Sequence, residues 1–177
     1  MKLSVVLSTH AASFNAVAFK GDFENNVAKI SGWGYDGVEL AIRDPALVDA
    51  SELESVVTAH GLAVPAIGTG QAWGEERLSF TSADPAVQLA ALERIKSHIP
   101  LAQRFNALII IGLIRGISPQ GQTHEQSLHY LVESLRECAG LAAPYGVRFA
   151  LEPLNRYETD LIHTVSEGLN LLEQVGA

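Results

Sequence analysis

The chain has 177 residues, 47% of them hydrophobic, so one domain spanning residues 1–177 can bury a sizeable core. A formal net charge of -8, with only 12 Lys and Arg and no basic cluster, argues against binding to nucleic acid. The single cysteine, Cys138, excludes an internal disulfide and fits a reducing compartment, and no apolar run approaches the roughly 18 residues of a membrane span. We therefore expect a cytoplasmic protein without nucleic-acid or membrane partners.

Short apolar runs rich in β-branched residues alternate with helical patterns along the chain. In chain order, we expect strands over residues 3–8, 38–42, 62–67, 107–113 and 147–152. The fourth run, Ala-Leu-Ile-Ile-Ile-Gly-Leu, is nearly all apolar, which is typical of strands covered on both faces. The stretch 68–77, which contains three glycines, is expected to form a loop.

Apolar residues at helical spacing follow each of these strands. The expected helices cover residues 23–33, 51–60, 85–104, 124–145 and 165–175. Ser51, with Glu54 three residues later, has the pattern of a capping box at the second helix. Ser82 or Asp84 is expected to cap the third, with Pro85 in its first turn.

About five strand-then-helix units predict an α/β fold with a parallel sheet, either doubly wound or a (β/α)8 barrel of the TIM type. Polar or charged residues follow the carboxyl ends of all five strands: His10, Glu39 with Arg43, Gln71, Arg115 and Glu152. Function gathered at that end slightly favours the barrel. A full barrel needs about 250 residues, or roughly 200 at minimum. We therefore expect an incomplete barrel with about five of its eight units.

Glu152 is the leading candidate for chemistry, because an apolar strand ends abruptly at this carboxylate and a proline-interrupted loop follows. A carboxylate at such a strand end costs free energy unless a cation or a substrate pairs with it. Glu152 is thus expected to be a metal ligand and a general base. The alternative is a structural ion pair with Arg148 or Arg156.

The other candidates leave more than one interpretation open. Glu158 could hydrogen-bond the hydroxyls of a polyol or simply be solvated, and His10 could contact a ligand or have no role. Glu39 lies four residues before Arg43, which favours a structural ion pair between them. Residues 68–71, Gly-Thr-Gly-Gln, lack the Lys-Ser/Thr of a P-loop and are expected to let backbone approach a ligand. No zinc-type Cys/His cluster, Gly-x-Ser-x-Gly elbow or Gly-x-Gly-x-x-Gly fingerprint is present in the sequence.

The segment 151–160, Leu-Glu-Pro-Leu-Asn-Arg-Tyr-Glu-Thr-Asp, resembles the fifth-strand motif of the ketose 3-epimerases in the xylose isomerase-like barrel superfamily. Further segments, covering essentially the whole chain, are similar to those of 5-keto-L-gluconate epimerases: residues 2–9, 18–22, 41–45, 66–72 and 109–116. The resemblance implies an isomerase of the sugar 3-epimerase type (EC 5.1.3-like). Its expected substrate is a keto-sugar or keto-sugar acid.

The resemblance also implies a mechanism. In this family a divalent ion, usually Mn²⁺, is held by Glu, Asp, His and Glu, and the two glutamates transfer protons on opposite faces of a cis-enediolate. Glu152 matches the first glutamate, and Glu158 matches the glutamate that contacts substrate. The remaining expected substrate contacts are Arg43, Thr69, Gln71, Arg115 and His10. The two arginines would suit the carboxylate of a keto-acid.

One departure from the family concerns the Asp, the His and the second Glu, which lie on later strands and have no counterpart here. The 177-residue chain alone is therefore expected to be inactive. It could be a fragment, half of a split barrel completed by a second chain or copy, or a non-catalytic sugar-binding or assembly protein. A ketose–aldose isomerase is the competing enzyme. Unpaired edges at the first and fifth strands favour a homo-oligomer.

Overall fold

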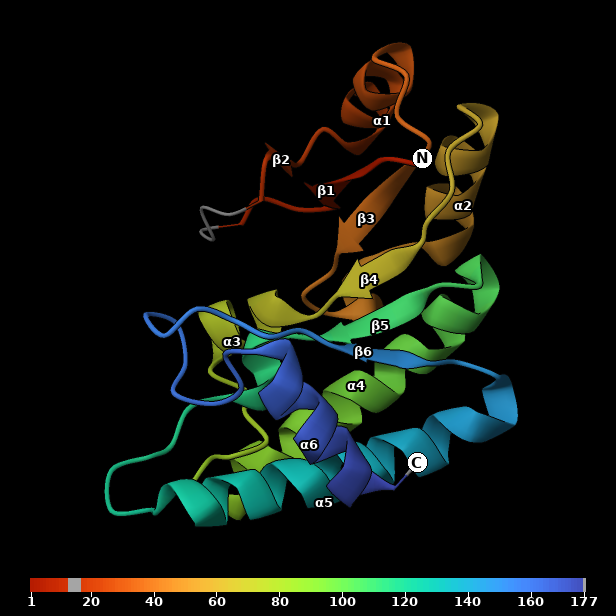
Figure 1. The fold of residues 1–177 in the computed structure, drawn as a ribbon. Coiled ribbons are helices and arrows are strands. Elements are labelled where there is room, and N and C mark those ends of the chain that lie inside the picture. The colour runs from red at the N-terminus through yellow and green to blue at the C-terminus, as the bar shows by residue number, and fades with distance from the viewer. Residues whose placement is uncertain (13–16, 177) are drawn as a thin grey trace.

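A computed structural model describes residues 1–12 and 17–176 of the chain. Its described strands form one parallel sheet in the order β2-β1-β3-β4-β5-β6 (Figure 1). The strands are β1 (Ser4–Ser8), β2 (Phe19–Lys20), β3 (Gly37–Ala41), β4 (Ala66–Gly68), β5 (Leu108–Ile111) and β6 (Phe149–Leu151).

Six α-helices and three short 3-10 helices connect the strands in this part of the chain. The α-helices are α1 (Phe23–Gly32), α2 (Ala50–Ala59), α3 (Gly70–Glu76), α4 (Pro85–Phe105), α5 (His124–Ala142) and α6 (Val165–Val175). The 3-10 helices are η1 (Pro45–Leu47), η2 (Leu113–Arg115) and η3 (Ala143–Tyr145). No helix among the described residues has both the length and the hydropathy needed to cross a membrane.

Strand order decides between the two expected architectures. Apart from the two-residue β2, the strands lie in the sheet in the order in which they occur along the chain, and every pairing is parallel. A doubly wound sheet instead reverses its strand order at a switch point. The sheet is therefore of the barrel type, as the gathering of polar residues at the strand ends suggested.

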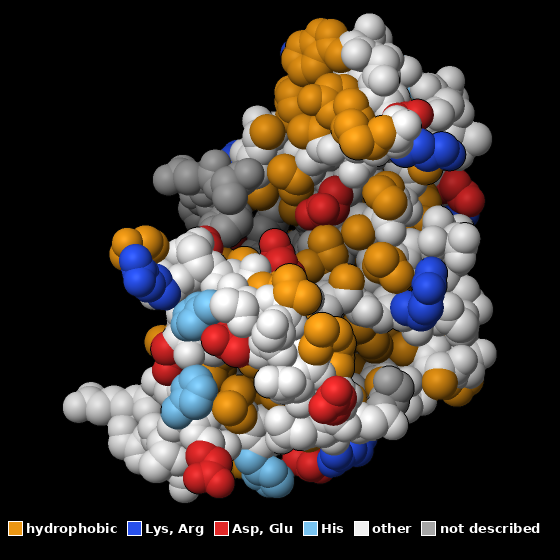
Figure 2. Space-filling model, viewed as in Figure 1, with side chains coloured by type: hydrophobic (Ala, Val, Ile, Leu, Met, Phe, Trp, Pro, Cys, Tyr) orange, Lys and Arg blue, Asp and Glu red, His pale blue; other side chains and the backbone are white. Residues whose placement is uncertain are grey.

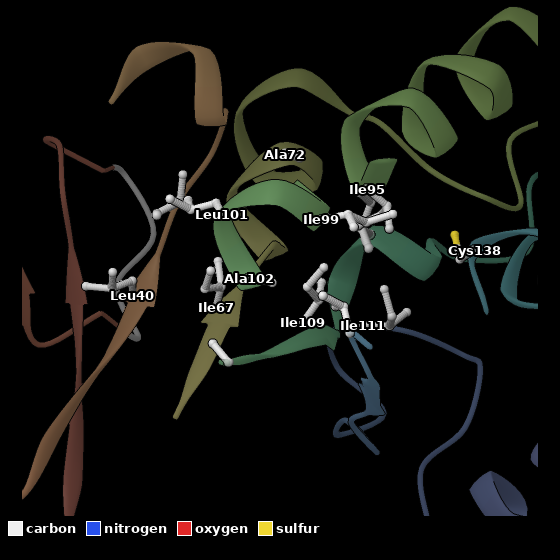
Figure 3. Packing of buried hydrophobic residues seen from close by; sticks show 14 of the residues in the cluster. Leu40, Ile67, Ala72, Ile95, Ile99, Leu101, Ala102, Ile109, Ile111 and Cys138 are labelled. Carbon is white, nitrogen blue, oxygen red and sulfur yellow. The ribbon is translucent and has the colours of Figure 1, made fainter. Parts of the chain in front are cut away.

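Burial alternates along β5 because successive side chains point to opposite faces of a sheet. Ile109 and Ile111 of β5 are fully buried and face Ile95 and Ile99 of α4 (Figure 3), whereas Ile110 between them is only partly buried. One face of the sheet is thus covered by helices. The other face is more open and carries the pocket described below.

Several sequence-based boundaries are confirmed by the structure. Helix α4 begins at Pro85 with Asp84 as its cap, the carboxylate oxygen accepting from the Ala86 N–H at 2.9 Å. Helix α6 covers the predicted 165–175. Cys138 is buried, and burial raises the pKa of its thiol to about 12, so the reactive thiolate is strongly disfavoured.

Other predictions were wrong for identifiable reasons. The cap of α2 is Asp49 rather than Ser51, because the Asp49 carboxylate accepts from the Ser51 and Glu52 N–H groups at 2.8 and 3.1 Å. The expected strand 62–67 is shorter and shifted to β4. The expected loop 68–77 contains helix α3, since the glycines there do not prevent a short helix. The first strand is not an edge, because β2 pairs with β1.

Gly37, at the start of β3, is required by close backbone packing. A Cβ at this position would lie 2.6 Å from the Ala63 carbonyl oxygen, and that oxygen already accepts from the Val38 N–H at 2.9 Å. The two atoms nearest to such a Cβ are the carbonyl oxygen and carbon of Ala63. Because both belong to the backbone, rotating a side chain cannot relieve the clash. A larger residue must therefore shift the strand.

We expect Gly37→Ala to lower the free energy of unfolding by about 2 kcal/mol, a typical cost of overpacking, in urea denaturation. Gly140→Ala is the matched control, because a Cβ there meets nothing within 4 Å in helix α5. That change should stabilise by up to about 1 kcal/mol, since alanine is the better helix former. Equal effects of the two substitutions would contradict the packing at Gly37.

Candidate active site

A pocket of about 500 Å³ lies on the open face of the sheet, toward the carboxyl ends of the strands. Figure 2 shows hydrophobic and acidic side chains together over the strands on this side of the molecule. The lining residues come from β1, β3, β4 and β5, from the segments that follow β4, β5 and β6, and from one residue before β2. They are Ser4, Val5, Val6, Val17, Glu39, Ala41, Gly68, Thr69, Gly70, Gln71, Ile110, Gly112, Leu113, Glu152, Leu154 and Glu158. Four predicted site residues are among them: Thr69, Gln71, Glu152 and Glu158.

Glu152 directly follows β6 and is fixed there by the sheet. Its N–H donates to the Ile111 carbonyl at 3.1 Å, so the β5–β6 ladder extends to the carboxylate-bearing residue. A Cβ on Gly112 would lie 2.6 Å from a Glu152 carboxylate oxygen. Glycine therefore leaves the space into which this carboxylate leans.

The surroundings of Glu152 favour its protonated form. Partial burial raises the pKa of Glu152, the guanidinium of Arg115 opposes this, and the negative charge of Glu158 raises the pKa further. A raised pKa makes the ionised carboxylate a stronger base toward a ligand proton. The residue is nevertheless exposed on the pocket side, as proton transfer to a ligand requires.

Glu39 also lines this pocket, although its spacing from Arg43 favoured a structural ion pair. The expected ion pair with Arg43 was wrong, because Arg43 Nε lies 3.3 Å from the Glu76 carboxylate instead. Burial raises the pKa of Glu39, and the charge of Glu152 raises it further. The period-two pattern of strand 38–42 was the signal that could have found it: Val38 and Leu40 are fully buried, so Glu39 faces the other side.

Glu158 lies in the loop after β6. The Asn155 side-chain amide donates to its carboxylate, and the Glu158 N–H donates to the Asn155 carbonyl at 3.1 Å. The Tyr157 N–H in turn donates to the Asn155 side-chain oxygen at 2.9 Å. These contacts hold the loop in a turn that directs Glu158 to the pocket.

Thr69 and Gln71 join the strand ends beneath the pocket. The Thr69 hydroxyl donates to the Ile110 carbonyl at 2.7 Å, and the Gln71 amide donates to the Ser8 hydroxyl at 2.8 Å. Both residues are buried, so little of either side chain faces solvent. These bonds tie β1, β4 and β5 together at the edge where ligands would bind.

Arg115 is fully buried and does not line the pocket. Its guanidinium donates to the carbonyls of Gly112 at 3.0 Å, of Ile162 at 3.5 Å and of Glu152 at a short distance. Burial lowers the pKa of Arg115 to about 10, while the charge of Glu152 opposes that change. In this structure the Arg115 side chain therefore stabilises the backbone at the end of β6 without lining the pocket.

Arg43 and His10 also lie outside the pocket lining. Arg43 belongs to a surface network in which Arg94 pairs with Glu76 at 2.7 Å and with Asp44 at 3.2 Å. His10 is exposed, and its Nδ1 is 2.9 Å from the Thr9 hydroxyl. The structure therefore does not bring either residue to Glu152.

The alternative ion pair for Glu152 is not formed. Among the described residues, no ion pair joins Glu152 to Arg148 or Arg156, and the Arg156 guanidinium lies 5.5 Å from the Tyr157 ring centre instead. The cation that acts on Glu152 is Arg115, which contacts its backbone carbonyl.

The described residues do not fit a complete metal site. Carboxylate oxygens suit hard divalent ions such as Mn²⁺, and Glu152 presents one carboxylate to the pocket. Within residues 1–12 and 17–176, however, no three His, Cys, Asp or Glu side chains come together as a metal-binding group. Glu152 alone cannot define a site.

Comparison with known proteins places the fold. Residues 27–177 match the family described as "Xylose isomerase-like TIM barrel". L-ribulose 3-epimerase of Mesorhizobium japonicum is 28% identical over 174 residues, which cover 97% of this chain and 57% of that enzyme. The chain therefore spans little more than half the length of this relative.

Solved structures of ketose 3-epimerases are similar to this chain as well. A structure of L-ribulose 3-epimerase superposes with a TM-score of 0.77 at 26% identity, over 98% of this chain and 57% of that one. D-allulose 3-epimerase from Methylomonas sp. in complex with D-allulose superposes with a TM-score of 0.73 at 25% identity, over 87% and 53%.

We expect Arg115→Met to lower the free energy of unfolding by about 3 kcal/mol in urea denaturation, because it removes charge-assisted hydrogen bonds from buried carbonyls. Arg115→Lys restores the charge but not the planar fork, so an intermediate loss is expected. A neutral surface change alters the free energy of unfolding by no more than about 0.5 kcal/mol. A loss of that size in Arg115→Met would contradict a stabilising role for Arg115.

The raised pKa of Glu39 predicts a pH-dependent effect on stability. The folded state binds this proton more tightly than the unfolded state, so its stabilising contribution is present below the usual pKa of 4.5 and lost as pH rises through the raised value. Glu39→Gln should therefore increase the free energy of unfolding at pH 7, with the gain shrinking below pH 4.5. Glu137→Gln, an exposed change on α5, is the control at pH 7, where it should alter the free energy of unfolding by no more than about 0.5 kcal/mol. A pH-independent gain would contradict the assignment.

Proposed function

The chain belongs to the xylose isomerase-like TIM barrel family, and we propose that its pocket serves the 3-epimerisation of a keto-sugar with Glu152 as an acid/base. Its relatives are ketose 3-epimerases, which supports an epimerase scaffold. The observation that carries the proposal is the position of Glu152. It combines a sheet-fixed backbone, a raised pKa and exposure to a pocket at the strand ends.

In the proposed reaction, the ionised Glu152 takes the proton from C3, the carbon next to the ketone. The C3–H bond breaks, its electron pair moves toward the carbonyl oxygen, and an enediolate forms. Return of a proton to the opposite face of C3 inverts that carbon. Preorganisation supports this role, because the backbone of Glu152 is held from both sides by the Ile111 carbonyl and by Arg115.

The substrate is proposed to be a neutral keto-sugar rather than a keto-sugar acid such as 5-keto-L-gluconate. Three carboxylates line the pocket, from Glu39, Glu152 and Glu158, and no Lys, Arg or His is among the described lining residues. A substrate carboxylate would meet repulsion there. Arg43 and Arg115, the cations expected to bind it, are engaged elsewhere. Sugar hydroxyls, in contrast, donate well to carboxylates.

A divalent ion, expected from the family resemblance to be Mn²⁺, would use Glu152 as one ligand. Because the described residues form no group of three ligands, the proton transfer above is assigned to the side chain alone. Activity is accordingly proposed for an assembled barrel, in which further strands or a further chain supply the other ligands and the second base. Strand β6 ends the described sheet, so it offers an unpaired edge for such an assembly or for a homo-oligomer.

In an active assembly, Glu152→Gln should slow the exchange of the C3 hydrogen of L-ribulose or D-allulose by about 10²–10⁴-fold, because glutamine cannot accept the proton. The exchange is measured in D₂O by proton NMR with MnCl₂ present. The isolated monomeric chain should show none.

Three outcomes would count against parts of this proposal. Retained exchange in Glu152→Gln would remove its role as the base. Exchange at C1 instead of C3 would indicate a ketose–aldose isomerase. Exchange by the purified monomer would overturn the need for assembly.

A further inference from the structure

Glu39 is the pocket carboxylate to which neither the family resemblance nor the reaction above gives a role. It lies in the middle of β3, where Val38 and Leu40 on either side are fully buried under helices. Strand alternation therefore turns Glu39 to the open face of the sheet. An ionisable residue in the interior of a strand is costly unless its side chain has a task on that face.

Two glycines make room for the pocket carboxylates. A Cβ on Gly68 would lie 3.4 Å from a Glu39 carboxylate oxygen, as a Cβ on Gly112 would lie 2.6 Å from a Glu152 carboxylate oxygen. Gly68 ends β4 and Gly112 follows β5, and these are the two strands between β3 and β6. On each of the two strands between the glutamates, a glycine thus leaves room for one of the two carboxylates.

The acceptor atoms of Glu39 are not used by the rest of the described protein. No hydrogen bond or ion pair to its carboxylate is found within residues 1–12 and 17–176, whereas Glu158 is held by Asn155 and Glu76 by Arg94. The influence of Glu152 on Glu39 is like-charge repulsion. A partly buried carboxylate without a donor is satisfied only by water or by a ligand.

We propose that Glu39 accepts a hydrogen bond from a hydroxyl of the bound keto-sugar on the β3 side of the pocket and so determines which sugars bind productively. The proposal rests on the proposed function and deepens it. Glu152 faces the reacting carbon from the β6 side, so a hydroxyl held by Glu39 sets the position of the sugar across the pocket. Glu39 would thereby select among ketoses by the location of that hydroxyl.

The expected size of the effect follows from the chemistry. A hydrogen bond to a charged group contributes about 1.5–3 kcal/mol, and a site built to accept a hydroxyl strongly rejects analogues that lack it. Loss of the contact should therefore weaken binding by about ten- to a hundredfold. Glutamine keeps the shape of the side chain and removes the charge.

The test measures binding of D-allulose and L-ribulose, and of their monodeoxy analogues, to the full chain by saturation-transfer NMR and calorimetry. Glu39→Gln should weaken binding of the parent sugar about tenfold or more. It should also reduce the discrimination against one deoxy analogue, because the amide oxygen is a weaker acceptor than a carboxylate, while the matched variant Glu137→Gln leaves both unchanged. Since Glu39→Gln should not destabilise the fold at pH 7, weaker binding cannot be ascribed to unfolding.

The outcomes separate the two proposals. If Glu39→Gln binds the parent sugars and every deoxy analogue as the wild type does, the role of Glu39 is overturned and the proposed function stands. If the wild type binds neither sugar, the proposed function fails together with this inference. If Glu39→Gln weakens the binding of the parent sugars and of every deoxy analogue equally, Glu39 does not recognise a particular hydroxyl and the inference fails.

Discussion

The buried guanidinium of Arg115 is the interaction on which the rest of the site depends. It donates to carbonyls from three separate segments, at Gly112 after β5, Glu152 after β6 and Ile162 in the following loop. Strand ends of a parallel sheet leave carbonyls that the ladder does not satisfy, and here one side chain satisfies several. The carboxylate of Glu152, the proposed base, is therefore carried by backbone that hydrogen bonds fix on both sides.

That brace also shapes the electrostatics of the pocket. Arg115 supplies a positive charge from behind Glu152, while Glu39 and Glu158 present negative charge from within the pocket. Burial raises the pKa of Glu152, the positive charge of Arg115 limits that rise, and the negative charge of Glu158 adds to it. Because the Arg115 guanidinium donates to backbone carbonyls and does not line the pocket, the charged groups that a ligand contacts there are carboxylates. This arrangement suits hydroxyl donors and disfavours anions.

Local sequence patterns predicted most of the fold and only part of the site. Helix α4 was predicted because Asp84 and Pro85 are local capping signals, and Glu152 because an apolar run ends at it. Strand β2 was missed because two residues give no periodicity. The brace role of Arg115 depends on carbonyls up to 47 residues away, which no local pattern encodes. The alternation of side-chain directions along the strand could have placed Glu39 in the pocket. The nearby Arg43 instead suggested an ion pair with Glu39, whereas in the structure Arg43 pairs with Glu76.

The proposed site requires that a keto-sugar binds between Glu39 and Glu152. An amide NMR titration of the ¹⁵N-labelled chain with D-allulose tests this binding directly. Saturable shifts are expected for the amides of Gly68 and Gly112, which lie next to the two carboxylates. Shifts confined to the separate groove near Pro100 and Leu101, or no shifts at all, would contradict it.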